Sequence, residues 1–200
     1  MSTETKNIDE LRDILLQVPE KLYCPDGEIN MELWDVAMDA IMDIGKQRIY
    51  ELKDEVYSIL NNCKCDDLRE EAVSTLGYSS RLHLPEFHDK ALALWQNEKE
   101  DDEIRRRALD AWVDYYELSG NAKVLTMLHE ILITSNNNTS FRATALCGIL
   151  TTDPEIENAK PLRIYDDLIL CKTSAEFESK VDWDTVHAIM RKYAPEALKK

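Results

Sequence analysis

The sequence is poor in the residues that build turns. It contains only 5 glycines and 6 prolines among 200 residues. A sandwich or barrel needs a turn after each short strand, and glycine and proline are the strongest turn formers. The scarcity of both therefore argues against a strand-rich fold and favours helices.

Long apolar runs and a regular cysteine framework are also missing. No uninterrupted apolar stretch approaches the ~18 residues of a membrane span. The first ten residues contain no basic stretch followed by an apolar one, which predicts no secretory signal, although a mature chain with its signal removed would look the same. The five cysteines are odd in number, which predicts reduced thiols and a cytoplasmic location; they are Cys24, Cys63, Cys65, Cys147 and Cys171.

Positive charge is scarce relative to negative charge. The chain has 39 Asp and Glu against 24 Lys and Arg, a net charge of -15, and residues 1–100 contribute -11 of it. A surface of this sign repels phosphate groups, so we expect neither a nucleic-acid partner nor binding to an anionic membrane. Hydrophobic residues make up 44% of the chain, which predicts a packed core instead of disorder.

Apolar residues recur with a period of 3.6 residues in nearly every segment, and none alternates convincingly as a strand would. The pattern therefore predicts an all-α fold. The expected helices span residues 7–18, 30–45, 47–61, 66–77, 84–97, 101–118, 121–134, 139–151, 160–171 and 183–198.

Four of these helices share one apolar frame centred on a small residue. The central alanines are Ala37, Ala72, Ala108 and Ala145, at intervals of 35, 36 and 37 residues. A second amphipathic helix follows each copy. Because one helix pair cannot bury its apolar face alone, such pairs stack and share a core. The spacing predicts an α-solenoid; the alternative is an irregular bundle with accidental self-similarity.

Three copies also share the pattern Arg-x-x-Ala-x-x-x-apolar, which begins at Arg69, Arg105 and Arg142. This pattern resembles the first helix of HEAT-type repeats, and the resemblance covers about residues 31–171. It implies a single domain, 1–200, of about four antiparallel helix pairs with caps at 1–30 and 172–200. The chain departs from the family at Trp34, which replaces the arginine, and in its period, shorter than the usual ~40.

The residues that carry common chemistries show no matching arrangement. We find no glycine-rich phosphate loop, no nucleophile elbow and no Ser/His/Asp pattern. Cys63 and Cys65 are spaced too closely for an ordinary zinc site, and His83 and His88 do not share a helix face. The sequence therefore predicts no catalytic residues, no metal and no cofactor.

The acidic residues, by contrast, are ordered. One stripe on an expected helix follows i, i+3, i+7 and i+11 spacing, away from the apolar face, and a shorter stripe occupies a later helix. The two stripes are Glu32, Asp35, Asp39 and Asp43, and Asp110, Asp114 and Glu117. Like charges at i, i+4 destabilise a helix by a few tenths of a kcal/mol. A sequence that keeps such stripes despite this cost suggests that they bind a partner. The alternative is a solvated face that aids solubility.

The second helix of each pair in a HEAT-type array usually lines the concave surface. Here those helices carry further acids with aromatic residues nearby, which would suit a basic protein partner. The residues are Glu51, Asp54, Glu55, Glu86 and Asp89, with Tyr50, Tyr57 and Trp95.

A small, acidic helical-repeat protein resembles the immunity proteins that neutralise secreted bacterial toxins. Many such toxins are nucleases, which are basic because their substrate is anionic. The resemblance implies an immunity protein of a contact-dependent growth inhibition system, bound to a toxic nuclease domain mainly through residues before about 117. The alternatives are a general HEAT-repeat scaffold or assembly factor and, more remotely, a bilin-lyase-like repeat enzyme.

Overall fold

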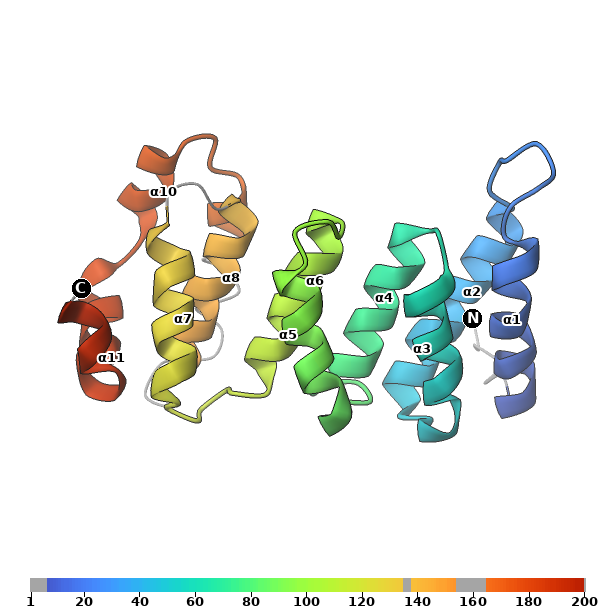
Figure 1. Cartoon of the computed structure of the whole chain (residues 1–200), viewed down its shortest axis with the longest axis horizontal. Helices are drawn as coiled ribbons and strands as arrows, with labels where there is room; N and C mark the ends of the chain where they lie inside the picture. The colour runs from blue at the N-terminus through green and yellow to red at the C-terminus, as the bar shows by residue number, and fades with distance from the viewer. Residues whose placement is uncertain (1–6, 135–137, 154–164, 200) are drawn as a thin grey trace, which may run out of the picture. The chain divides into compact units, whose positions relative to one another are not determined.

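The computed structural model describes residues 7–134, 138–153 and 165–199 (Figure 1). Over these residues the chain is all-helical and contains no strand, apart from an isolated antiparallel bridge between Tyr23 and Ile29. The α-helices are α1 (Ile8–Lys21), α2 (Met31–Gln47), α3 (Lys53–Asn62), α4 (Asp66–Gly77), α5 (His88–Gln96), α6 (Asp102–Asp114), α7 (Ala122–Ile133), α8 (Thr139–Leu150), α10 (Ser174–Lys180) and α11 (Trp183–Tyr193).

Most expected helices are present within a few residues of their predicted ends. The expected helix 183–198 stops at Tyr193 and continues as a 3-10 helix over Pro195–Lys199, because proline lacks the amide that a helix interior needs. The short helix α10 was not predicted. Of the expected helix 160–171, residues 165–169 are helical and residues 160–164 lie outside the described part of the chain.

The chain divides into two compact units, Met1–Trp112 (unit 1) and Val113–Lys200 (unit 2). Unit 1 holds 26 acidic and 14 basic residues, a net charge of -12, which leaves -3 for unit 2. Most of the net negative charge therefore belongs to unit 1. No helix in the described ranges combines the length and the apolarity that a membrane span requires.

In unit 1 the helices pack with their neighbours in the sequence. α1 lies against α2 and also against α3, while α4 lies against α3 and also against α2. α2 and α3 are not among the closely packed pairs. The sequence predicts that residues 30–45 pair with residues 47–61, which correspond to α2 and α3. In the structure α2 packs closely with α1 instead, and α3 packs closely with α4.

The four recurrent alanines lie in the core, and each is completely buried. Small residues elsewhere also bring helices close together. A Cβ on Gly77 of α4 would lie 2.5 Å from the Cβ of Ala111 in α6 and 3.2 Å from the ring of Phe87. The backbone of α4 therefore approaches its neighbours so closely that no side chain larger than hydrogen fits at Gly77.

The three recurrent arginines make one shared contact. Nε of Arg69 donates to the carbonyl of Leu60, and Nε of Arg105 donates to the carbonyl of Trp95, both at 3.1 Å. These carbonyls lie in the last turns of α3 and α5, where helical oxygens lack intrahelical donors. Each arginine therefore completes the hydrogen bonding of the preceding helix and places positive charge at its negative end.

Unit 2 contains the third such arginine. α7 and α8 pack together, and α11 packs on both. Arg142 of α8 is only 2% exposed; it donates to the carbonyl of Leu132 at 2.7 Å and to the hydroxyl of Ser174 at 3.0 Å. It also pairs with Glu178 and stacks over the ring of Phe177. One buried cation thus ties α10 to the end of α7.

Candidate protein-binding surface

The acidic stripe of α2 lies on the solvent side of a well-defined helix. Asn30 caps the helix start, where its side chain accepts a hydrogen bond from the amide of Leu33 at 3.2 Å. The opposite face of α2 is buried. Three of the four stripe carboxylates are exposed and the last is half-buried; in order they are Glu32, Asp35, Asp39 and Asp43. We call these four residues the α2 stripe.

No cation of the described residues pairs with the α2 stripe. Across the described ranges, none of its four carboxylates takes part in an ion pair. Several other carboxylates in unit 1 form ion pairs with arginine side chains. The α2 stripe is therefore a source of uncompensated negative potential, and such a potential attracts basic molecules.

The second predicted stripe, on α6, is different. Asp110 is half-buried and accepts from Arg106 at 2.9 Å and from the hydroxyl of Tyr78 at 3.4 Å. Glu70 of α4 pairs with Arg106 and with Arg107. Burial, followed by the charge of Asp110, raises the pKa of Tyr78, so the phenol stays protonated as a donor. Asp110 thus belongs to an internal network between α4 and α6.

Of the other predicted stripe residues, Glu117 is exposed beyond the end of α6, and Asp114 lies in the last turn of that helix. It is half-buried and makes polar interactions of its own. Unlike the carboxylates of the α2 stripe, it is not free of partners.

The acids predicted on the second helices are mostly paired. Glu55 of α3 accepts from Arg12 of α1 at 2.8 Å. Glu86 and Lys53 pair at 2.8 Å, and the hydrogen bond from the lysine lowers the pKa of the Glu86 carboxyl. Asp89 lies 2.8 Å from the ring nitrogen of His88. Glu51 and Asp54 remain; both are exposed, and neither forms an ion pair with any described residue.

The three predicted aromatic anchors differ in exposure. Tyr50 is 48% exposed. Tyr57 is half-buried with its ring edge-on to Phe87 at 6.0 Å, and Lys90 lies 5.1 Å above it. Burial raises the pKa of Tyr57 to about 12. Of the two tyrosines, only Tyr50 presents a largely accessible ring to a partner.

Trp95, the third predicted anchor, is half-buried in α5. Its indole Nε1 is buried and meets no acceptor among the described residues. Its carbonyl accepts the bond from Arg105, so the backbone of this residue has a structural role.

The predicted partner-binding residues do not form one surface. α2 packs beside α4, whereas α3 packs beside α1, so α2 and α3 belong to different layers of unit 1. The α2 stripe and the α3 acids each lie on the side of their helix away from the core. A single flat partner therefore cannot cover both sets, and the uncompensated set is the α2 stripe.

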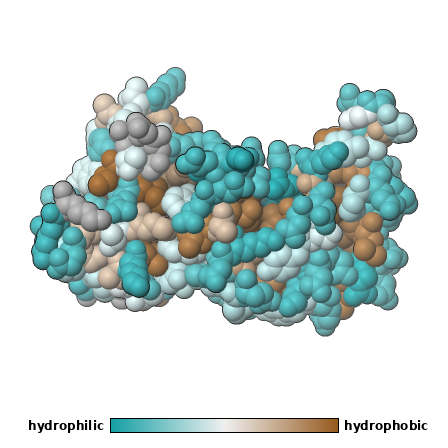
Figure 2. All heavy atoms as spheres, in the orientation of Figure 1, coloured by the Kyte–Doolittle hydropathy of each residue, from teal (hydrophilic) through white to brown (hydrophobic). Residues whose placement is uncertain are grey.

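Sequence reasoning missed two features at the start of unit 1. The first is apolar exposure beside the stripe, where Met31 is 58% and Ile29 is 37% exposed. Most residues on the face drawn in Figure 2 are hydrophilic, with hydrophobic residues showing in places. In the sequence, the apolar residue Met31 directly precedes the acidic stripe, and this pattern could have indicated an interface at this end of α2.

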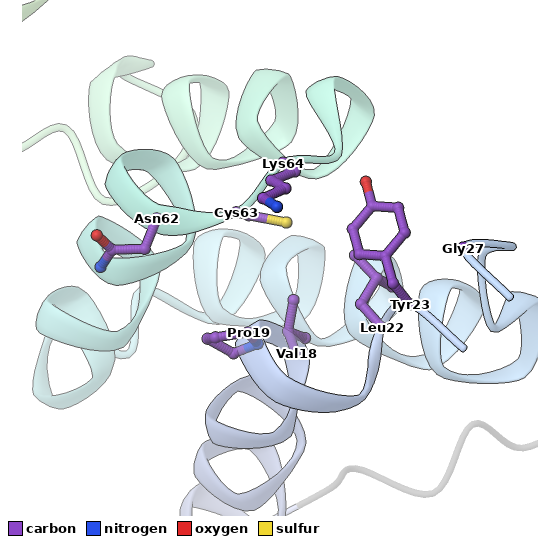
Figure 3. Close-up of a pocket in the computed structure, with 8 residues that line it drawn as sticks. All are labelled: Val18, Pro19, Leu22, Tyr23, Gly27, Asn62, Cys63 and Lys64. Carbon is purple, nitrogen blue, oxygen red and sulfur yellow. The ribbon is translucent and has the colours of Figure 1, made fainter. Parts of the chain in front are cut away.

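The second feature is a cavity of about 460 Å³ between the end of α1 and the α3–α4 connection (Figure 3). Val18, Pro19 and Leu22 form its apolar side, and the ring of Tyr23 stands beside them. The connection contributes further lining residues, Asn62, Cys63 and Lys64. Burial raises the pKa of the Cys63 thiol, which keeps it protonated and poorly nucleophilic.

No protein-family model, curated protein or solved structure matches this chain. Among the described residues, no group of three or more His, Cys, Asp or Glu side chains is placed to hold a metal ion. The candidate site is therefore defined by the charge, exposure and packing of the chain's own residues, and its main element is the α2 stripe.

Proposed function

We propose that this protein is an acidic inhibitor that binds a basic protein, and specifically an immunity protein that neutralises a toxin nuclease domain. The observation that supports the proposal best is the absence of any ion pair at the α2 stripe within the described chain. Four uncompensated carboxylates on one exposed helix face suit the cationic surface that a nuclease needs for its own anionic substrate.

We also propose that the helix pairs form a HEAT-like array. Two features support this architecture: the recurrent arginines make the same contact with the preceding helix, and the recurrent alanines are all buried. In such an array successive helices present parallel rows of side chains on one face. An inhibitor built this way covers a broad partner surface with rigid elements that lose little entropy on binding.

The mechanism of inhibition is direct blocking. Uncompensated carboxylates speed the encounter with a cationic partner, and this effect weakens as salt screens the charges. Once bound, an acidic face over a nuclease cleft competes with the phosphates that the cleft would otherwise hold. Met31 and Ile29, exposed next to Glu32, would add apolar contact area to the charged contact.

The test uses two variants of equal charge change. The first reverses Asp35, Asp39 and Asp43 to Lys on α2. The second reverses Glu51, Asp54 and Asp89 to Lys; all three are exposed and lie outside α2. Each is assayed for binding to the C-terminal domain encoded by a toxin gene directly upstream, and for protection of cells that express that domain.

We expect the α2 variant to lose affinity by on the order of 100-fold and to stop protecting cells, while the matched variant keeps most of both. Equal losses in the two variants would mean that net charge alone matters. Full protection by the α2 variant would reject the α2 stripe as the binding surface.

A scaffold that joins two partners is the second candidate, and one observation favours it. The exposed acids of α2 and the exposed acids Glu51 and Asp54 lie on different layers, so they could serve two proteins at once. A scaffold of this kind would lose one partner in each of the two charge-reversed variants and would protect no cell from a toxin.

A further inference from the structure

The cavity of unit 1 has preformed walls. Its apolar side comes from Val18 and Pro19 at the end of α1 and from Leu22, which follows the helix (Figure 3). The amide of Asn30 donates to the carbonyl of Leu22 at 2.7 Å and holds the loop after α1 in place. A volume of about 460 Å³ lies within the range of pockets that bind small molecules, and such pockets are usually formed before the ligand arrives.

Two side chains of the lining are hydrogen-bond donors without an acceptor of their own. The hydroxyl of Tyr23 and the ammonium of Lys64 make no hydrogen bond or ion pair with any described residue. Burial raises the pKa of Tyr23 above its ordinary value of 10.0 and also raises the pKa of the Cys63 thiol. Both groups therefore keep their protons, and the cavity offers donors to an oxygen atom of a guest.

The charge of the lining is positive. Among the described residues that line the cavity, Lys64 alone is charged, and Figure 3 shows its nitrogen turned toward the α1 side. A guest with a negative group therefore meets a cation in the lining, whereas a positive guest meets no carboxylate there. Acids close to lining residues in the sequence are exposed, where water and salt screen them, and do not line the cavity; they are Glu20, Asp26, Glu28, Asp66 and Asp67.

We propose that this cavity binds a small organic acid. The apolar body of the acid lies against Val18, Pro19 and Leu22, where a flat ring or a short alkyl chain fits. Its carboxylate accepts hydrogen bonds from the ammonium of Lys64 and the hydroxyl of Tyr23, and charge-assisted bonds of this kind are stronger than neutral ones. The site does not depend on the proposed inhibitor function, because no residue of the α2 stripe lines it.

The first experiment compares two probes of nearly equal shape, 4-phenylbutyrate and its neutral amide, 4-phenylbutyramide. The ¹⁵N-labelled full chain is titrated with each. We expect saturable shifts at the amides of Tyr23, Gly27 and Lys64 with the acid, and affinity about fivefold lower with the amide, the ratio that one exposed ion pair produces. Equal binding of the two probes, tighter binding of the cationic 4-phenylbutylamine, or no saturable shift at these amides overturns the proposal.

Charge variants test the role of Lys64. Lys64→Met keeps the aliphatic stem and removes the charge, so it should bind the acid and the amide equally well, while Lys64→Arg should retain the preference for the acid. Lys46→Met is the matched control, because Lys46 is exposed on α2 and, like Lys64, forms no ion pair with a described residue. A preference that survives Lys64→Met, or that the control removes equally, would show that Lys64 does not hold the carboxylate.

A plug variant locates the binding. Asn62, the last residue of α3, is exposed and lines the cavity, so Asn62→Trp fills the space from the surface without disturbing the core. Gln96 is the exposed last residue of α5 and provides the control Gln96→Trp. Asn62→Trp alone should abolish the shifts. Binding that is unchanged in both variants would place the acid elsewhere on the chain and reject the site.

A last probe separates a free acid from the carboxyl end of a protein. The probe is the peptide acetyl-Gly-Gly-Phe, which carries a free terminal carboxylate beside an aromatic ring. We expect it to bind more weakly than 4-phenylbutyrate, because its added backbone amides lose water without finding partners on the apolar side. Tighter binding of the peptide would assign the cavity to a protein C-terminus and overturn a free acid as its ligand.

Discussion

Nε of Arg142 in α8 donates to the backbone carbonyl of Leu132 in α7 at 2.7 Å. The same contact joins Arg69 to Leu60. In both cases the guanidinium also reaches a carboxylate more than thirty residues further along the chain, Glu178 for Arg142 and Glu100 for Arg69. One side chain thereby satisfies a helix end and holds the next segment in place.

We expect Arg142→Met to destabilise the protein by about 2–4 kcal/mol, because it leaves a buried carbonyl and Glu178 without their donor. Urea unfolding followed by circular dichroism measures the loss. Arg191→Met is the control, since Arg191 is exposed and makes no polar contact with the described residues. A loss no larger than in that control would show that the shared arginine contact contributes little.

Gly77→Ala should destabilise unit 1 by about 1–3 kcal/mol, because its methyl group would meet the Cβ of Ala111 at 2.5 Å. The double variant Gly77→Ala, Ala111→Gly removes that clash and should regain part of the lost stability, as measured by the midpoint of thermal unfolding. No recovery would mean that the ring of Phe87, at 3.2 Å, is the more severe obstacle.

Neutralising the α2 stripe should make the protein more stable while it weakens partner binding. Asp35, Asp39 and Asp43 form two i, i+4 pairs of like charge, so replacing all three with Asn should stabilise the fold by about 0.5–1 kcal/mol. The difference between the urea midpoints of the variant and the wild type at low salt measures the gain. This gain should shrink at 1 M salt, where the Debye length falls to about 3 Å and the repulsion is screened. A gain that does not depend on salt would have another cause than repulsion.

The Arg69–Glu100 pair predicts an acid-sensitive stability. The hydrogen bond from Arg69 lowers the pKa of Glu100 below its ordinary value of 4.5. A carboxyl whose pKa is lower in the folded state stabilises the fold above its unfolded pKa, and the contribution disappears as pH falls through the folded value. Wild type should therefore exceed Glu100→Gln in stability at pH 6 and lose that advantage below about pH 4. A constant difference from pH 6 to pH 2.5 would contradict the pairing.

Unit 2 should lose stability at mildly acidic pH because of His129. Burial, followed by the charge of His187, lowers the pKa of His129 below 6.5. The histidine therefore binds a proton more readily in the unfolded state than in the folded state. The free energy of unfolding falls as pH drops from about 6.5 towards the pKa of His129 in the folded protein. Hydrogen exchange of α7 between pH 7.5 and pH 5 reports the loss. His129→Gln should flatten the profile, and His187→Gln should reduce its slope; an unchanged slope in His129→Gln would point to another group.

Sequence reasoning located most helices because their apolar periodicity is local. It failed at helix pairing, since every amphipathic helix offers an apolar face and which neighbour covers it depends on three-dimensional packing. The same limit applies to charge. Glu55 looks like Asp54 in the sequence, yet Arg12, forty-three residues away, pairs with Glu55 and leaves Asp54 exposed.

By itself, the sequence determined the all-helical fold, the recurrence of alanine and arginine, and the placement of four acids on one face of α2, because each follows from residue type and helical spacing. Only the tertiary structure decided which charges are compensated. Arg106 reaches Asp110 within its own helix, while Arg107 reaches Glu70 on another. The α2 stripe stays uncompensated because α4 and α1 pack against the opposite face of its helix and bring no cation to it.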